Sequence, residues 1–165
     1  MEEMARPMRI DIVIPAFNEE ARIDRTLRAY RSSVPDPGAR FLVALDSCTD
    51  RTADVVRSHA EVDARVELHE FPKLGKGGVI MEMFRHCDAD MVGFVDADCA
   101  TPPAEFLRLV DMPEQVDGAI ASRAHPASVL PTHRSLGSGR LAPAPALRRP
   151  GCTHLLQRAR GGAIS

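Results

Sequence analysis

Short apolar runs alternate along the chain with segments in which apolar residues recur at helical spacing. The runs, rich in Val, Ile, Leu, Phe and Ala, lie at residues 10–14, 41–45, 66–68, 91–95 and 118–121. The segments between them predict helices that begin near residues 18, 49, 75 and 102. This order predicts an α/β domain with a doubly wound, mainly parallel sheet and helices on both of its faces.

Residues with known preferences for helix ends indicate where these helices start. Asn18 precedes two glutamates and is expected to be the N-cap of the first helix. Thr49 or Asp50 is expected to cap the second helix in the same way. Pro102 and Pro103 suit the first turn of the fourth helix, where a missing backbone N–H costs nothing.

The helical and strand periodicity ends before the C-terminus. From about residue 137 the sequence is dominated by Gly, Ala, Pro and Arg, with little apolar periodicity. This composition predicts a C-terminal tail that is largely irregular, with a short helix near residues 155–160 as an alternative.

Charge divides the chain in the same way. The net charge of the 165 residues is −2, but residues 1–117 hold 14 Lys and Arg against 23 Asp and Glu, whereas residues 118–165 hold seven Arg and no acid. Because the folded part is acidic and the tail has no interleaved aromatic residues, binding to nucleic acid is disfavoured. The four cysteines show no C-x-x-C spacing, which disfavours a zinc site or a disulfide framework.

Neither a membrane span nor a secretion signal is visible in the sequence. No apolar run reaches the roughly 18 residues that a transmembrane helix needs, and charged residues precede Ile10. A cytoplasmic protein is therefore expected.

Polar side chains follow three of the predicted strands. Asp96 and Asp98 come directly after the run at 91–95, Asn18 and Glu19 follow the first run, and Asp46 follows the second. Because open α/β sheets bind ligands at the carboxyl ends of their strands, these side chains are expected to share one site with helix N-termini. Carboxylate oxygens suit Mg²⁺ or Mn²⁺ carrying a phosphorylated ligand, so Asp96 and Asp98 are the candidate metal ligands.

Five ordered segments resemble the family 2 glycosyltransferases of the GT-A fold, and among them the polyprenyl-phosphate sugar transferases such as dolichol-phosphate mannose and glucose synthases. The matching segments are residues 12–20, 45–52, 75–78, 95–102 and 121–123. The resemblance implies a nucleotide-sugar-binding GT-A domain at residues 9–125, preceded by an extension at 1–8. Residues 126–165 would then be a disordered tail or an incomplete acceptor region, truncated or altered after about residue 135.

The resemblance also implies roles for individual residues. Positions expected to bind the nucleotide sugar are Pro15, Ala16, Asn18, Glu19, Asp46, Lys76, Gly77 and Asp96. Asp96 and Asp98 become the Asp-x-Asp motif that binds the diphosphate through Mg²⁺ or Mn²⁺, and Arg123 could hold a phosphate on the acceptor side. Leu45 and Ser47 replace an Asp and a Gly that are common in the family, which leaves the choice between uracil and guanine open.

The implied reaction transfers a hexose, with inversion, from a donor of the UDP-glucose or GDP-mannose type to a polyprenyl or dolichyl phosphate at the inner face of a membrane. No Asp or Glu follows Asp117, where a general base for a hydroxyl acceptor would be expected. A phosphate acceptor needs no such base, because a phosphomonoester, with a second pKa of about 6, is already largely ionised.

Two other functions remain open from the sequence alone. One is a non-catalytic remnant or interaction module that binds a nucleotide diphosphate and whose basic tail contacts a partner or anionic lipids. Such a protein would show no turnover. Sugar nucleotidyl transfer would need a longer Gly-rich loop near the N-terminus, whereas Pro15-Ala16-Phe17 follows the first strand. The sequence does not indicate an oligomeric state.

Overall fold

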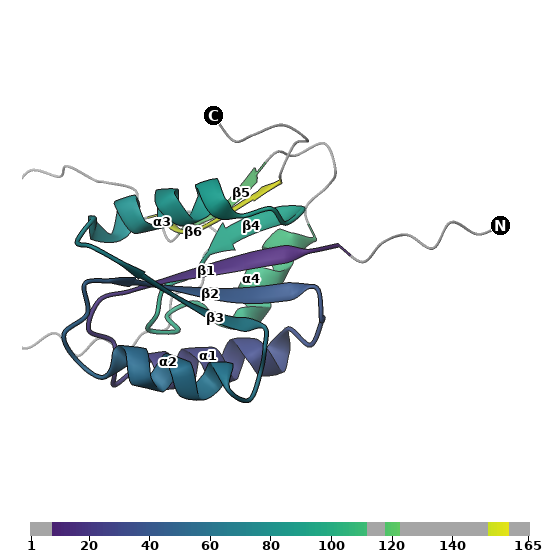
Figure 1. The fold of residues 1–165 in the computed structure, drawn as a ribbon. Coiled ribbons are helices and arrows are strands. Elements are labelled where there is room, and N and C mark those ends of the chain that lie inside the picture. The colour runs from purple at the N-terminus through teal and green to yellow at the C-terminus, as the bar shows by residue number, and fades with distance from the viewer. Residues whose placement is uncertain (1–7, 112–117, 123–151, 159–165) are drawn as a thin grey trace, which may run out of the picture.

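The computed structural model describes residues 8–111, 118–122 and 152–158. These residues form six strands and four helices (Figure 1). The strands are β1 (Ile10–Ala16), β2 (Ala39–Asp46), β3 (Val66–Phe71), β4 (Met91–Phe94), β5 (Gly118–Ser122) and β6 (Cys152–Arg158). The helices are α1 (Ile23–Ser33), α2 (Thr52–Ala60), α3 (Gly75–His86) and α4 (Pro103–Val110).

The strands form a single sheet in the order β3-β2-β1-β4-β6-β5. Strands β3, β2, β1 and β4 are parallel, with Ile10 opposite both Ala39 and Met91, and β6 runs antiparallel to β4 and β5. The chain proceeds outward from β1 to β3, and α3 then returns it to β4 on the other side of β1. The order therefore reverses between β1 and β4, which is where open α/β sheets form a ligand-binding crevice.

Two hydrophobic clusters cover the two faces of the sheet. Ile12 and Ile14 of β1 pack with buried residues of α1, α2 and α4, whereas Val13, between them, packs with α3. Figure 1 shows α1 and α2 on one side of the sheet and α3 on the other. Because both faces are buried, the central strands are mostly apolar, as is typical of parallel sheets. The predicted α/β fold with helices on both faces is confirmed.

Two helix starts and the C-terminal segment differ from the structure predicted from the sequence. Helix α1 begins at Ile23, with Arg22 as its N-cap, so the prediction that Asn18 caps it is wrong. Helix α2 begins at Thr52 with Arg51 as its N-cap, not Thr49 or Asp50, although the Asp50 carboxylate accepts the Thr52 N–H at 3.0 Å. The prolines do start α4. Residues 152–158 form a strand that pairs with β4 and β5, so for this segment both the predicted irregular tail and the alternative helix near residues 155–160 are wrong.

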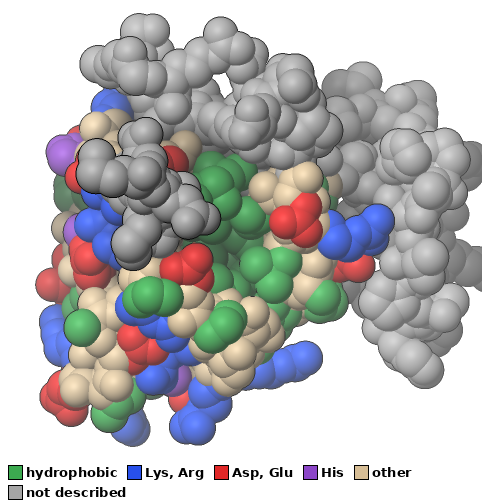
Figure 2. All heavy atoms as spheres, turned by 90° about the vertical axis from the view of Figure 1, so that its right-hand side faces the viewer, with side chains coloured by type: hydrophobic (Ala, Val, Ile, Leu, Met, Phe, Trp, Pro, Cys, Tyr) green, Lys and Arg blue, Asp and Glu red, His purple; other side chains and the backbone are tan. Residues whose placement is uncertain are grey.

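An ion cluster lies where β1 and β2 begin. The Asp11 carboxylate is fully buried, and Arg40 donates to both of its oxygens, at 2.8 and 2.7 Å. Arg40 also pairs with Asp88 at 3.0 Å, and Arg9 pairs with the same carboxylate at 3.3 Å. Figure 2 faces this side of the molecule, where acidic and basic side chains are interspersed. These pairs join β1, β2 and the residues before β4 at the edge opposite the strands' carboxyl ends.

A second group of ion pairs joins α1 to the segment between α2 and β3. Asp63 accepts hydrogen bonds from Arg65, at 2.9 and 3.0 Å, and from Arg31 at 2.9 Å. The hydrogen bonds from Arg65, together with Arg31 and against the opposing effect of burial, hold the pKa of Asp63 well below its usual range. Asp63 is therefore ionised in the folded protein well into the acid range.

We expect Asp63→Asn to lower the free energy of unfolding at pH 7 by about 1–2 kcal/mol, because two arginines lose a charged partner. Since folding lowers the pKa of Asp63, its contribution is complete above the unfolded pKa of about 3.9 and is lost as the pH falls below that value. Urea denaturation at pH 7 and at pH 3 should show the difference from wild type shrinking in acid. Asp54→Asn, at an exposed ion pair with Arg57, is the matched control. A difference that stays constant or grows at pH 3 would contradict the prediction.

Candidate functional site

The loops that follow β1 and β2 are joined by hydrogen bonds. Asn18 has a left-handed φ of 53°, and its side-chain oxygen accepts the Thr49 N–H at 2.9 Å. Three further bonds join the same loops: Glu19 N–H to Thr52 Oγ1 at 2.8 Å, Glu20 N–H to Asp50 at 3.1 Å, and Arg51 N–H to Glu20 at 2.9 Å. Asn18 thus links two loops, and its side chain holds them together beside the sheet edge.

The loop that carries the two aspartates after β4 is fixed by α1. The buried Thr26 hydroxyl donates to the Ala97 carbonyl at 2.7 Å, and the Tyr30 hydroxyl donates to the Thr101 carbonyl at 3.1 Å. Burial, with Cys99 and Asp96 nearby, raises the pKa of Tyr30 well above its usual value, so its hydroxyl remains a donor. These two bonds span the segment that contains Asp96 and Asp98 and hold it in place.

Asp46, at the end of β2, holds the start of α3. Asp46 is only 6% exposed, and its carboxylate accepts the Leu74 N–H at 2.6 Å and the Gly75 N–H at 3.1 Å. A carboxylate at a helix N-terminus satisfies free N–H groups and is stabilised by the helix dipole. Gly75 has a φ of +75°, which glycine adopts without strain. Asp46 therefore positions Lys76, the second residue of α3, beside the sheet edge.

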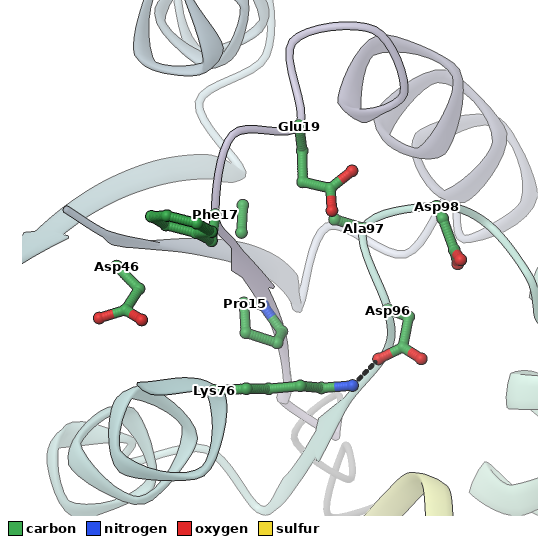
Figure 3. Close-up of a pocket in the computed structure, with 9 residues that line it drawn as sticks. Pro15, Phe17, Glu19, Asp46, Lys76, Asp96, Ala97 and Asp98 are labelled. Carbon is green, nitrogen blue, oxygen red and sulfur yellow. Dashed lines mark hydrogen bonds and ion pairs between the residues drawn. The ribbon is translucent and has the colours of Figure 1, made fainter. Parts of the chain in front are cut away.

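These loops surround a cleft of about 230 Å³ at the carboxyl ends of β1, β2 and β4. Its lining residues are Pro15, Ala16, Phe17, Glu19, Asp46, Lys76, Asp96, Ala97 and Asp98. In Figure 3, Phe17 and Asp46 lie toward one end of the cleft and Asp96 and Asp98 toward the other. Lys76 extends from α3 to Asp96, where its ammonium is 2.5 Å from Oδ1.

Most of the residues proposed from the sequence meet in this cleft. The structure brings together Pro15, Ala16, Glu19, Asp46, Lys76, Asp96 and Asp98. Asn18 and Gly77 are not among the lining residues, because Asn18 binds the neighbouring loop and Gly77 lies within α3. Arg123 lies outside the described residues. The ligand contacts themselves remain predictions.

Phe17 is a lining residue that the sequence reasoning did not select. Phe17 is 47% exposed, and the Lys73 ammonium lies 4.2 Å from the centre of the Phe17 ring. The available signal was a large aromatic residue directly after a buried strand, in a loop that is otherwise polar. An exposed ring at the edge of a cleft offers a flat apolar face to a planar ligand.

The charged groups of the cleft are paired to different degrees. Glu19 is held by Arg22, at 2.6 Å, and Asp46 is held by backbone N–H groups. Asp96 has Lys76 as its counter-ion, whereas the exposed Asp98 carboxylate accepts the Ala100 N–H at 2.9 Å. Glu19 and Asp96 are therefore paired with long basic side chains, whereas Asp46 and Asp98 accept hydrogen bonds from the backbone.

The site can be tested for its fit to a divalent cation. Within the described part of the chain, no group of three or more His, Cys, Asp or Glu is placed to hold a metal ion. Asp96 nevertheless holds a cationic ammonium inside the cleft, and Asp98 is two residues away on the same loop. One or two carboxylates completed by phosphate oxygens and water are the usual environment of Mg²⁺, so these residues fit a cation that arrives with a phosphorylated ligand.

Comparisons with known proteins identify the family of this chain. The model of the family described as "Glycosyl transferase family 2" matches residues 11–140. Glycosyltransferase AglD of Haloferax volcanii is 29% identical over 140 residues, which cover 81% of this chain and 22% of that protein. The undecaprenyl-phosphate 4-deoxy-4-formamido-L-arabinose transferase of Pseudomonas aeruginosa is 33% identical over 110 residues, or 64% of this chain and 32% of that one. The chain thus spans about a fifth to a third of the length of these relatives.

A solved structure shows the same fold. The mannosyltransferase PcManGT from Pyrobaculum calidifontis, in complex with GDP-Man and Mn²⁺, superposes with a TM-score of 0.55 at 22% identity. The superposition covers 69% of this chain and 35% of that one. The family match extends over well more than half of the chain and includes every described residue that lines the cleft. The chain therefore belongs to glycosyl transferase family 2, a class of enzymes with the GT-A fold.

Proposed function

We propose that the cleft binds a nucleotide-diphosphate sugar together with Mg²⁺ or Mn²⁺, and that its hexose is transferred with inversion to a polyprenyl or dolichyl phosphate at the cytoplasmic face of a membrane. The observation that carries this proposal is the meeting of Asp96, Asp98, Lys76 and Phe17 in one cleft at the point where the strand order reverses. Such a cleft has a charged end for a diphosphate and an aromatic end for a base.

The end of the cleft near Phe17 suits a nucleobase. Stacking of a base on an aromatic ring is worth about 1–3 kcal/mol and tolerates any base, because every base has a π-face. The Lys73 ammonium lies over the Phe17 ring and would move aside when a base stacks there. Glu19 and Asp46 add carboxylate oxygens that can accept hydrogen bonds from base N–H or ribose hydroxyl groups. Both a UDP-glucose and a GDP-mannose type of donor fit this end.

The opposite end suits a diphosphate. Asp96 and Asp98 would hold the cation, which supplies Lewis-acid stabilisation of the charge on the departing nucleoside diphosphate. Lys76, at the start of α3, places a positive charge and the positive end of a helix dipole beside the same position. Lys76 and the start of α3 would therefore attract and orient the phosphates, because the phosphates are negatively charged.

The acceptor step needs little from the protein beyond positioning. An oxygen of the acceptor phosphate forms a bond to the anomeric carbon as the bond from that carbon to the donor diphosphate breaks, and the nucleoside diphosphate leaves. A single displacement of this kind inverts the anomeric centre. The acceptor phosphate needs no general base, because a phosphomonoester is already largely ionised. Arg123 is proposed to hold that phosphate through its planar guanidinium.

The name of a relative supports a polyprenyl-phosphate acceptor, because the Pseudomonas protein is an undecaprenyl-phosphate sugar transferase. An acceptor of this kind lies at a membrane surface, which this chain would approach from the cytoplasm. No helix in the described ranges has the length and apolarity to cross a bilayer.

Calorimetric titration of the chain with UDP and with GDP, each with and without Mn²⁺, tests the donor site. We expect one of the two nucleotides to bind, and to bind far more weakly when Mn²⁺ is removed with a chelator, because the diphosphate then lacks the cation that would link it to Asp96 and Asp98. A second assay follows sugar transfer from the matching nucleotide sugar to a polyprenyl phosphate. Binding without transfer would favour a non-catalytic nucleotide-binding module, and binding of neither nucleotide would contradict the proposed function.

A further inference from the structure

Of the two lysines of this chain, Lys76 lines the cleft and Lys73 lies over the ring of Phe17, a lining residue. The sequence contains 21 basic residues, of which only Lys73 and Lys76 are lysines. The Lys76 ammonium is 2.5 Å from Asp96 Oδ1 and 5.9 Å from the centre of the Phe94 ring. Its side chain is 55% exposed, whereas the Asp96 side chain is 20% exposed. A flexible and largely exposed cation therefore covers a carboxylate that is mostly sheltered.

Lys76 can leave Asp96 without disturbing the fold. Among the described residues that line the cleft, Lys76 is the one basic side chain, and it is part of α3 through its backbone alone. Lysine is a compact charge on a four-carbon chain, so it can follow an anion more readily than an arginine held by a bidentate geometry. The other cleft carboxylates have different partners: Glu19 is paired with Arg22, and Asp46 is bound by the backbone of the α3 start.

The position of the ammonium has a consequence for metal binding. A cation bound to Asp96 would lie close to the Lys76 ammonium, so repulsion between the two positive charges opposes its binding while the ammonium stays on the carboxylate. A displaced ammonium in a cleft needs a new anion, and a diphosphate bound to that cation provides one within reach of the flexible side chain. A cation that arrives without a diphosphate leaves Lys76 without this compensation.

We propose that Lys76 is an internal counter-ion of Asp96 that couples the binding of the divalent cation to the binding of the nucleotide diphosphate. Paired with Asp96, Lys76 neutralises the carboxylate and opposes binding of the cation alone. When cation and diphosphate are both present, Lys76 transfers from the carboxylate to a phosphate oxygen. The inference rests on the proposed function. It adds that the cation and the nucleotide raise each other's affinity by the same factor, as linkage requires.

The test compares Lys76→Met with Lys73→Met in the full chain. Mn²⁺ binding is measured by electron paramagnetic resonance without nucleotide, and UDP and GDP binding is then measured by calorimetry at saturating Mn²⁺. For Lys76→Met we expect Mn²⁺ alone to bind about five-fold more tightly, the upper range for removal of a partly exposed ion pair. The nucleotide should bind about ten-fold more weakly, because a charge-assisted hydrogen bond to phosphate is lost. Lys73→Met should leave the affinity for Mn²⁺ alone unchanged, because its ammonium lies over the Phe17 ring.

A second measurement follows the two lysines directly. With ¹³Cε-labelled lysine the chain gives two lysine signals, which the two methionine variants assign. Without ligands, Asp96→Asn should shift the Lys76 signal and leave that of Lys73 in place. In the wild type, Mg²⁺ with the nucleotide should shift the Lys76 signal further than Mg²⁺ alone at the same concentration.

The outcomes separate the inference from the proposed function. If the wild type binds a nucleotide with Mn²⁺ but Lys76→Met leaves the affinity for Mn²⁺ alone unchanged or lower, the counter-ion role is wrong and the nucleotide site stands. If the wild type binds neither UDP nor GDP, the proposed function fails, and the transfer of Lys76 to a phosphate fails with it.

Discussion

Replacing Asp98 by alanine is expected to abolish metal-dependent nucleotide binding while leaving the fold intact. Asp98 lies in the cleft with an exposed carboxylate, which accepts a hydrogen bond from the Ala100 N–H at 2.9 Å. Removing a residue that hydrogen-bonds to a metal ligand lowers the affinity for the metal about 10- to 100-fold. Removing the ligand Asp98 itself should therefore lower that affinity more than about 100-fold. The free energy of unfolding should fall by less than about 1 kcal/mol, because one exposed hydrogen bond is lost.

Calorimetric titration with the preferred nucleotide and Mn²⁺ measures the affinity, and urea denaturation measures the stability. Glu105→Ala is the matched control, because Glu105 is an exposed acid of the following helix that pairs with Arg108 at 3.0 Å and does not line the cleft. It should bind as the wild type does. Undiminished Mn²⁺-dependent affinity in Asp98→Ala would show that Asp98 is not a metal ligand.

The largest effect on stability is expected at the opposite edge of the sheet. Arg40→Ala should lower the free energy of unfolding by about 3 kcal/mol, because it leaves the Asp11 carboxylate buried without its charged partner. The Asp11 side chain is 1% exposed, and Arg40 donates to both of its oxygens. A buried charge that loses its partner is far more costly than an exposed one, since water cannot replace the lost interaction.

Urea denaturation of the single variants Arg40→Ala and Asp11→Asn and of the double variant gives the interaction energy of the pair. The double variant should recover part of the loss, because the remaining side chain is then neutral. Arg57→Ala is the control: its ion pairs with Asp54 and Glu70, at 3.3 and 3.4 Å, are largely exposed, so the loss should stay below about 1 kcal/mol. Equal losses for Arg40→Ala and Arg57→Ala would contradict the prediction. Nucleotide affinity should not change in Arg40→Ala, because Arg40 pairs with Asp11 at the edge of the sheet opposite the cleft.

The sequence by itself determined the fold class and the edge at which the site lies. Strands buried on both faces are mostly apolar, so β1, β2 and β4 were visible as apolar runs, and polar residues directly after these runs had to lie at one edge. The placement of Asp96 and Asp98 in the cleft followed from this local pattern. The start of α4 was also predictable from the local sequence, because Pro102 and Pro103 act through the geometry of the first helical turn.

Tertiary structure decided which partners those residues have. Asn18 has the sequence context of a helix cap, yet its oxygen binds Thr49, a residue from another loop. Residues 152–158 became a strand because β4 and β5 offered unpaired edges, and such a partner cannot be recognised in the segment's own composition.

The same holds for the electrostatics of the site. Asp46 binds the start of α3, 28 residues away, and Lys76 reaches Asp96 over 20 residues. Neither pairing has a sequence signature, because each depends on the crossover that returns the chain from β3 to β4 and brings three loops to one edge. The sequence therefore determined which charges stand at the strand ends, and the topology of the sheet decided which of them are neutralised by the protein itself.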